Sequence, residues 1–221
     1  MTDWEALARR EEERYRDGLE RMPDDPDGRQ KQLVRMANAA LGAGLSRLMQ
    51  GRRAEASGWL ARAAQRYRES YASAPPESWG RLIGAVKARV LADDRAGAEE
   101  DARWVLEQGA AGAESPIGRY AGTLAQLVLG DDRAAARLSA SLRAEAAERF
   151  PAEVAEALAG LADRDVAVYR DALERVLRSF ETRDAYLEDV PVADTVIVLD
   201  ALAERRDMAV RAVSTLLPAR V

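Results

Sequence analysis

The chain contains no cysteine and no histidine. Without cysteine there are no disulfides, no thiolate nucleophiles and no sulfur ligands for a metal ion. Without histidine there is no Ser-His-Asp triad, no zinc site of the usual kind and no side chain whose ordinary pKa lies near neutrality. Chemistry based on carboxylates is the main kind of catalysis that this composition still allows.

Long apolar runs are missing as well. No uncharged apolar stretch approaches the ~18 residues that a membrane-spanning helix needs, and the opening residues 1–5 lack the basic region of a signal peptide. We therefore expect a cytoplasmic protein with no membrane partner. The 33 basic residues face 38 acidic ones, and the resulting charge of −5 favours solubility, so we expect no nucleic-acid partner either.

Aromatic residues make up 5% of the chain, and isoleucine occurs only at Ile83, Ile117 and Ile197. Alanine, leucine, arginine and glutamate dominate instead, and these residues have high helix propensity. A chain of 221 residues that is 48% hydrophobic is long enough to bury a substantial core. The sequence therefore predicts an all-α fold, with about 9–10 helices from its apolar periodicity.

Several helix ends are marked by local signals. Thr2 with Glu5 suggests a capping box at the start of the first helix. A second helix is expected from about residue 30 to residue 50, with an apolar face of small residues that allows close helix contact. Ser115 followed by Pro116 predicts an N-cap with proline at the first helical position.

Two nearly identical segments, residues 90–98 and 128–136, lie 38 residues apart and are predicted to be turns between helices. Spacings of about 30–45 residues with two helices per unit are typical of stacked α-hairpins. In this arrangement, over roughly residues 29–180, the chain resembles the tetratricopeptide-like (TPR-like) helical-repeat proteins. The resemblance implies stacked antiparallel helical hairpins that form an α-solenoid.

We expect a single all-helical domain over residues 1–221. Residues 1–28 are predicted to form an N-terminal capping helix and loop, because this segment is highly charged and breaks at prolines. Residues 29–180 would hold the helical hairpins. Residues 181–221 would form a C-terminal helix and an extended apolar tail.

Three pairs of adjacent aspartates are the first candidates for chemistry. They are Asp24-Asp25, Asp93-Asp94 and Asp131-Asp132. Their carboxylates are of the type that holds Mg²⁺ or Ca²⁺. The second and third pairs precede alanine-rich segments, where aspartate caps free backbone N–H groups, and the first pair lies among prolines in an expected solvated loop. We therefore expect no metal and no cofactor, and a Mg²⁺-dependent helical enzyme is the least favoured alternative.

A polar, acidic connection follows residue 180 and contains one aromatic side chain. Its candidate contact residues are Glu181, Asp184, Tyr186, Glu188 and Asp189. Paired carboxylates of this kind suit acid–base work when one of them has a raised pKa. An aromatic residue flanked by charge is also a common anchor at protein interfaces. A solvated connection with neither role is the simplest explanation, and the five residues are the predicted partner-binding patch if one exists here.

Arginines alternate with tyrosines near Tyr15 and near Tyr67, a combination that suits phosphate contacts with base stacking. Compensating glutamates lie beside them at helical spacing, so ion-paired helix faces are the better explanation. The four tryptophans are expected to be core anchors. They are Trp4, Trp59, Trp79 and Trp104.

The chain ends with a helix, the acidic connection, the run from Asp194 to Val210, and a close on Leu216-Leu217-Pro218. This order resembles the C-terminal region of the immunity protein 49 family. The resemblance implies an all-helical protein that protects a cell from a polymorphic toxin by binding that toxin. It implies no catalytic residues.

These observations favour a non-enzymatic helical-repeat protein that acts by binding another protein. Its sharpest form is an immunity protein that covers the basic face of a cognate toxin, since an acidic surface speeds association with a basic partner. A general adaptor or regulatory scaffold is the alternative. The sequence leaves open whether leftover apolar helix surface produces a homodimer.

Overall fold

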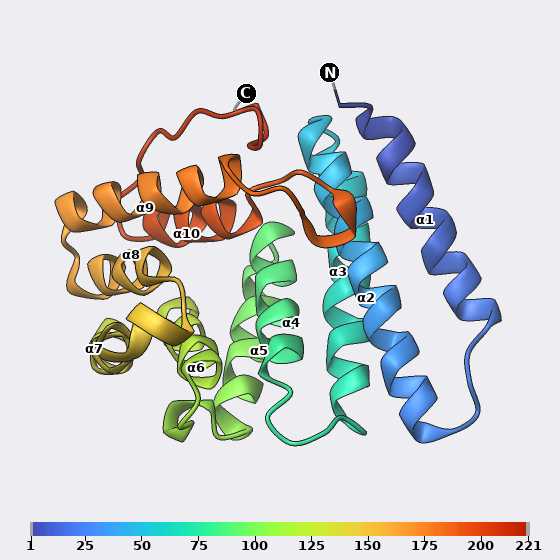
Figure 1. Cartoon of the computed structure of the whole chain (residues 1–221), viewed down its shortest axis with the longest axis horizontal. Helices are drawn as coiled ribbons and strands as arrows, with labels where there is room; N and C mark the ends of the chain where they lie inside the picture. The colour runs from blue at the N-terminus through green and yellow to red at the C-terminus, as the bar shows by residue number, and fades with distance from the viewer. Residues whose placement is uncertain (1, 220–221) are drawn as a thin grey trace. The chain divides into compact units, whose positions relative to one another are not determined.

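The computed structural model describes residues 2–219, apart from the side chains of residues 145–149. Within that part of the chain the protein is all-α, as the composition predicts, with ten α-helices and two short 3₁₀ helices (Figure 1). The α-helices are α1 (Trp4–Glu20), α2 (Pro26–Met49), α3 (Arg53–Tyr71), α4 (Trp79–Leu91), α5 (Arg95–Glu107), α6 (Pro116–Leu129), α7 (Asp132–Arg149), α8 (Ala152–Asp163), α9 (Val166–Glu181) and α10 (Asp194–Glu204). The 3₁₀ helices are η1 (Ala110–Gly112) and η2 (Leu187–Asp189).

The chain divides into two compact units, each of which combines segments that are distant in sequence. Unit 1 comprises Met1–Asp94, Arg183–Asp194 and Ser214–Val221, and unit 2 comprises Arg95–Thr182 and Thr195–Val213. This division does not decide whether residues 1–221 fold as a single domain, so that expectation stays a prediction.

In unit 1, helices α1 to α4 pack mainly on their neighbours in sequence. Small residues of α2 allow a close approach to α3, as the sequence predicts. A Cβ atom added to Gly44 of α2 would lie 2.6 Å from Cγ of Leu60 on α3, a side chain that is fully buried. Because glycine has no Cβ, the two helices pack at a distance that a larger residue would prevent.

Helices α5 to α9 of unit 2 also pack in sequential order. A Cβ atom at Gly160 of α8 would lie 2.7 Å from the main-chain nitrogen of Tyr169 on α9, so α8 and α9 meet almost backbone to backbone. In both units, packing between sequential neighbours is consistent with stacked helical pairs. The finer expectation, a TPR-like solenoid, stays a prediction.

A buried arginine joins three segments of unit 2. Arg206, which follows α10, donates to Oδ1 of Asp132 from Nε at 3.0 Å and from Nη2 at 2.5 Å. It also donates to the main-chain oxygens of Leu127 at 2.7 Å and Leu202 at 2.9 Å. These carbonyls lie in the last turns of α6 and α10, where helix carbonyls lack intrahelical partners. Arg206 therefore caps the C-terminal ends of α6 and α10 and forms an ion pair with Asp132, the first residue of α7.

The helix start predicted at residue 115 is confirmed, and the one predicted at residue 2 is wrong. Ser115 caps α6, because its Oγ accepts a hydrogen bond from the Gly118 N–H at 3.2 Å. At the start of α1 the cap is Asp3 rather than Thr2, and its carboxylate accepts from the Ala6 N–H at 2.9 Å. Thr2 and Asp3 are both good N-cap residues, and the carboxylate of Asp3 in addition places a negative charge at the positive end of the helix dipole.

Helix α2 begins earlier than the expected residue 30. Asp25 caps it by accepting from the Gly28 N–H at 2.6 Å, and Pro26 occupies the first helical position. The prolines that suggested a solvated loop therefore include the start of a helix. A proline in the first turn loses no hydrogen bond, since its N–H would lack a partner there in any case.

The two similar segments do form helix–helix turns, but the turns differ by one residue. In residues 90–98 the left-handed residue is Asp93, with φ of 56°, whereas in residues 128–136 it is Gly130, with φ of 78°. Glycine adopts this conformation at no steric cost, so the second turn reverses one position sooner. In consequence α5 begins at Arg95, and α7 begins one aligned position earlier, at Asp132.

Candidate functional site

The acidic connection belongs to unit 1, and its C-terminal half is anchored there. Residues 183–190 form what we call the connecting segment, which ends at Val190. Val190 and Val192 are buried, and Asp194 accepts a hydrogen bond from Nζ of Lys87 at 2.6 Å. Figure 1 shows this part of the chain beside α2, and η2 contacts that helix.

Most of the connecting segment before Val190 faces solvent. Asp184 and Asp189 are exposed, and Tyr186 is half-buried. Leu187 keeps 53% of its surface exposed, although leucine is usually buried. An exposed apolar side chain with acidic neighbours is therefore the most prominent chemical feature of this segment.

The backbone around Leu187 adopts a costly conformation. Glu188 and Asp189 both lie in the left-handed region, with φ of 54° and 53°. This conformation costs roughly 1–2 kcal/mol for each residue that is not glycine. Two turn hydrogen bonds, from the Asp189 N–H to Tyr186 O and from the Val190 N–H to Leu187 O, each at 3.1 Å, accompany it. The surrounding structure must supply the rest of the stabilisation.

Two arginines of α1 supply it. Arg14 donates to the carboxylate of Glu188, and Arg10 donates to the main-chain oxygen of Glu188. The fully buried carboxylate of Glu11 accepts from both arginines, from Nε of Arg10 at 2.7 Å and from Nη1 of Arg14 at 2.8 Å. We call Arg10, Glu11 and Arg14 the clamp. Its two cations and the carboxylates of Glu11 and Glu188 balance in charge.

The electrostatics of Arg14 agree with this arrangement. Burial lowers the pKa of Arg14, but the hydrogen bonds and negative charges of Glu188 and Glu11 outweigh it and leave that pKa raised. Space for the clamp comes from α2, because a Cβ atom at Gly42 would lie 3.0 Å from Cγ of Glu11. Glu11 therefore reaches its buried position over a glycine.

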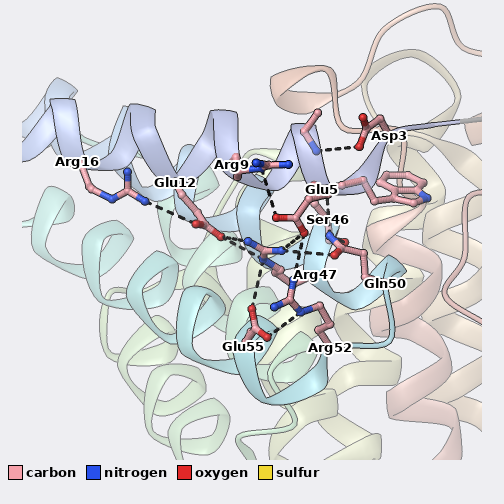
Figure 2. A network of polar contacts seen from close by, with 12 residues as sticks. Asp3, Glu5, Arg9, Glu12, Arg16, Ser46, Arg47, Gln50, Arg52 and Glu55 are labelled. Carbon is pink, nitrogen blue, oxygen red and sulfur yellow. Dashed lines mark hydrogen bonds and ion pairs between the residues drawn. The ribbon is translucent and has the colours of Figure 1, made fainter.

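A second polar network docks α1 onto the rest of unit 1 (Figure 2). Arg47 of α2 has only 6% of its side chain exposed, and its guanidinium bonds Glu5 at 2.5 Å and Glu12 at 2.7 Å, both on α1. Glu55 of α3 lies 3.6 Å from it. One buried cation thus joins three helices through carboxylates that remain partly exposed.

The predicted contact residues divide between the two units. Glu181 is an exposed residue at the end of α9 in unit 2, whereas the other four candidates lie on the connecting segment of unit 1. Among those four, Glu188 is turned toward the clamp, with 14% of its side chain exposed. Neither Leu187 nor the three clamp residues belong to the patch predicted from the sequence.

The aspartate pairs occupy structural positions in the part of the chain described. Asp131 accepts from the Ala134 N–H at 2.9 Å, which confirms the predicted capping role for this pair. Asp94 accepts from Arg89 at 2.8 Å. Among the side chains that the structure describes, no group of three or more acidic residues is placed so that it could hold a metal ion. Over the same residues, no helix is both long and apolar enough to cross a membrane.

The tryptophans differ from the core anchors that we expected. Trp79 is buried, but Trp4, Trp59 and Trp104 are partly exposed. Trp59 packs edge to face on Tyr15, with ring centroids 5.5 Å apart, and carries the guanidinium of Arg62 at 4.8 Å from its ring centroid. Stacking of an arginine on the indole explains how this tryptophan is stabilised near the surface.

A scan against protein-family models, a search of curated proteins and a search of solved structures each found no match to this chain. The resemblance to the immunity family therefore rests on the sequence of the C-terminal region alone, from the helix before the acidic connection to Leu216-Leu217-Pro218.

Proposed function

We propose that this chain is a non-enzymatic protein-binding protein and that it contacts its partner through residues 184–189. The observation that carries the proposal is Leu187, an apolar side chain that is 53% exposed on a segment held in a costly conformation. Left-handed residues also occur in ordinary turns of this chain, as at Asp93, but here two occur in succession and two arginines and a buried carboxylate hold them. A site at which strain is maintained by surrounding contacts is typical of ligand and partner recognition.

The proposed partner surface is basic and has an apolar pocket. Asp184 and Asp189 are exposed on either side of Leu187, and the chain as a whole carries a charge of −5. Opposite charges around an apolar anchor speed association and orient the two proteins, while the anchor contributes most of the affinity. Because the segment is already ordered, binding would lose little conformational entropy.

In the more specific form of this function, the partner is a toxin, and the chain acts by steric occlusion of the toxin's basic face. The support is the resemblance of residues 194–218 to the immunity family, together with the acidic charge around Leu187. An adaptor function would use the same surface with a harmless partner.

The first experiment is a matched capture from native cell lysate at low and at moderate salt, with the tagged wild type, Leu187→Asp and Val213→Asp. Val213 is the control because it is an apolar residue of unit 2 that is 89% exposed. We expect one stoichiometric basic protein with the wild type and the control, and at least about a tenfold loss with Leu187→Asp, as for a central anchor. Equal capture by all three proteins would contradict the assignment of the surface.

The toxin form is tested with the captured protein itself. It is expressed in a susceptible host alone, with the wild-type chain and with Leu187→Asp. Growth arrest that is relieved by the wild type and not by the variant supports neutralisation. Normal growth with the captured protein alone would indicate an adaptor instead.

A further inference from the structure

We propose that α1 controls the connecting segment: Arg10, Glu11 and Arg14 are positioning residues that hold Leu187 in the conformation that binds a partner. The effect on binding rests on the proposed function, whereas the effect on the conformation of the segment does not. Release of the clamp would convert residues 184–189 from an ordered surface into a mobile loop.

The clamp holds Glu188 at two independent points. Arg14 bonds the side-chain carboxylate, and Arg10 bonds the main-chain oxygen of the same residue. With a contact to the carboxylate alone, the peptide group would be held by the turn hydrogen bond from the Asp189 N–H to Tyr186 O and would lack the second restraint from Arg10. With both contacts present, the orientation of the Glu188 backbone is set, and with it the direction in which the neighbouring Leu187 projects.

Glu11 makes this arrangement possible. Arg10 and Arg14 lie one helical turn apart on α1, where two like charges repel each other. The carboxylate of Glu11, with none of its side chain exposed, accepts one hydrogen bond from each arginine. It thereby reduces their repulsion and directs both guanidinium groups toward Glu188. Loss of this carboxylate would leave two partly buried cations with one carboxylate between them.

The position of α1 decides whether the clamp can act. Within the described residues, the packing of α1 on another helix is mainly on α2. Its charged contact with that helix is centred on Arg47, which bonds both Glu5 and Glu12. Tyr15 adds a smaller contact with α3, edge to face on Trp59 and through a hydrogen bond from Arg66 Nε at 3.0 Å. A helix packed mainly on one neighbour and held by partly exposed ion pairs belongs to the less stable part of a fold. Displacement of α1 would therefore release the connecting segment while α2 and α3 stay packed.

The first test needs no partner and uses hydrogen exchange in the full-length chain. The reporters are the Asp189 and Val190 amides, whose hydrogen bonds at 3.1 Å close the turn around Leu187. We expect Arg14→Ala to speed their exchange at least about tenfold, because the ordered turn then opens more often. Arg14→Lys keeps the charge but replaces the planar guanidinium, whose Nη1 bonds both Glu11 and Glu188, with a more strongly hydrated ammonium group, so its effect should be intermediate.

Arg16→Ala is the matched control, since Arg16 is an α1 arginine with 59% of its side chain exposed and a single 3.7 Å contact to Glu12. It should leave exchange at Asp189 and Val190 unchanged. Amides in the middle of α2 report whether the fold is intact. Unchanged exchange of the two reporters in Arg14→Ala, with the α2 amides still protected, would overturn the proposal.

The second test measures affinity for the captured partner. Arg14→Ala should weaken binding by about three- to tenfold, chiefly through slower association, since only the fraction of molecules with an ordered segment binds. If the segment is released but affinity is unchanged, the link between clamp and binding is wrong. That result leaves the proposed function standing, because the function itself is judged by Leu187→Asp.

Discussion

Among the side chains that the structure describes, each unit has one buried arginine, and the two arginines have different surroundings. Arg47 in unit 1 meets the carboxylates of Glu5, Glu12 and Glu55, of which Glu5 and Glu55 have 40% and 47% of their side chains exposed. Arg206 in unit 2 has 4% of its side chain exposed and bonds one carboxylate and two main-chain carbonyls.

Burial of the cation alone therefore does not decide how much an ion pair contributes to the free energy of unfolding. When Arg47 is lost, its partly exposed carboxylates regain water. When Arg206 is lost, the carbonyls of two helix ends and the carboxylate of Asp132 lose a partner in the interior of unit 2. We therefore expect unit 2 to depend on its arginine much more strongly than unit 1.

Arg206→Ala should have the largest effect. Breaking a buried pair by removing one partner costs about 3–5 kcal/mol. Here the carbonyls of Leu127 and Leu202 lose their guanidinium donor, and Asp132 keeps its contact with the exposed Arg164. Urea unfolding of the full chain, followed by circular dichroism, measures the change in the free energy of unfolding.

Arg164→Ala is the control for that variant, since Arg164 bonds the same carboxylate of Asp132 at 3.0 Å but has 64% of its side chain exposed. Its loss should cost less than about 1 kcal/mol, as for other surface ion pairs. If the two variants lose comparable free energies of unfolding, the proposed difference between buried and exposed arginines is wrong.

Arg47→Ala should cost less than Arg206→Ala, about 2 kcal/mol, which is the range for hydrogen bonds to charged groups. The loss should be concentrated in α1, because two of the three carboxylates belong to that helix. Hydrogen exchange of α1 amides against those of α3 checks this. A loss in unit 1 as large as that of Arg206→Ala would contradict the explanation based on exposure.

Glycine substitutions provide the smallest and most local comparison. In Gly160→Ala the new Cβ meets the backbone of Tyr169, which cannot move aside, so overpacking of about 1–3 kcal/mol outweighs the gain of about 1 kcal/mol in helix propensity. In Gly44→Ala the Cβ lies 2.6 Å from Cγ of the buried Leu60 and 3.3 Å from its main-chain nitrogen, so a side chain rather than the backbone takes most of the strain and the loss should be smaller than in Gly160→Ala.

Gly80→Ala serves as the reference for both, because no atom lies within 4 Å of a Cβ built at this position of α4. It should stabilise the chain by up to about 1 kcal/mol through helix propensity alone. Thermal unfolding of the three variants ranks them. A Gly44→Ala loss greater than that of Gly160→Ala would show that the α2–α3 contact is the more rigid one.

Local signals predicted the helices well, as the ends of α6 illustrate. Ser115 supplies the N-cap side chain and Pro116 occupies the first helical position, while Gly130 provides the left-handed residue at the C-terminal end. The prediction was wrong at Thr2 and placed the start of α2 too late, because neighbouring aspartates compete for the same cap and sequence alone does not rank them. Helix boundaries are the least reliable part of such predictions.

The candidate site was only partly predictable. Tyr186 and its acidic neighbours attracted attention through their composition, but Glu188 is bonded to residues of α1 that lie 174 and 178 positions away in the sequence. On α1 the same arginines were expected to pair within their own helix face. That expectation is met by Arg14 and Glu11, yet no periodicity shows that Glu11 is fully buried.

Composition and local pattern were enough to predict the all-helical class, the absence of thiol and imidazole chemistry, the helix start at Ser115 and the turns at residues 90–98 and 128–136, because propensity and capping act over a few residues. Three features depend on the tertiary structure. They are the burial of the charged groups of Glu11, Arg47 and Arg206, the inward orientation of Glu188 and the exposure of Leu187. Those outcomes depend on contacts between helices that are distant in the chain, where the loss of water around each charge outweighs any local preference.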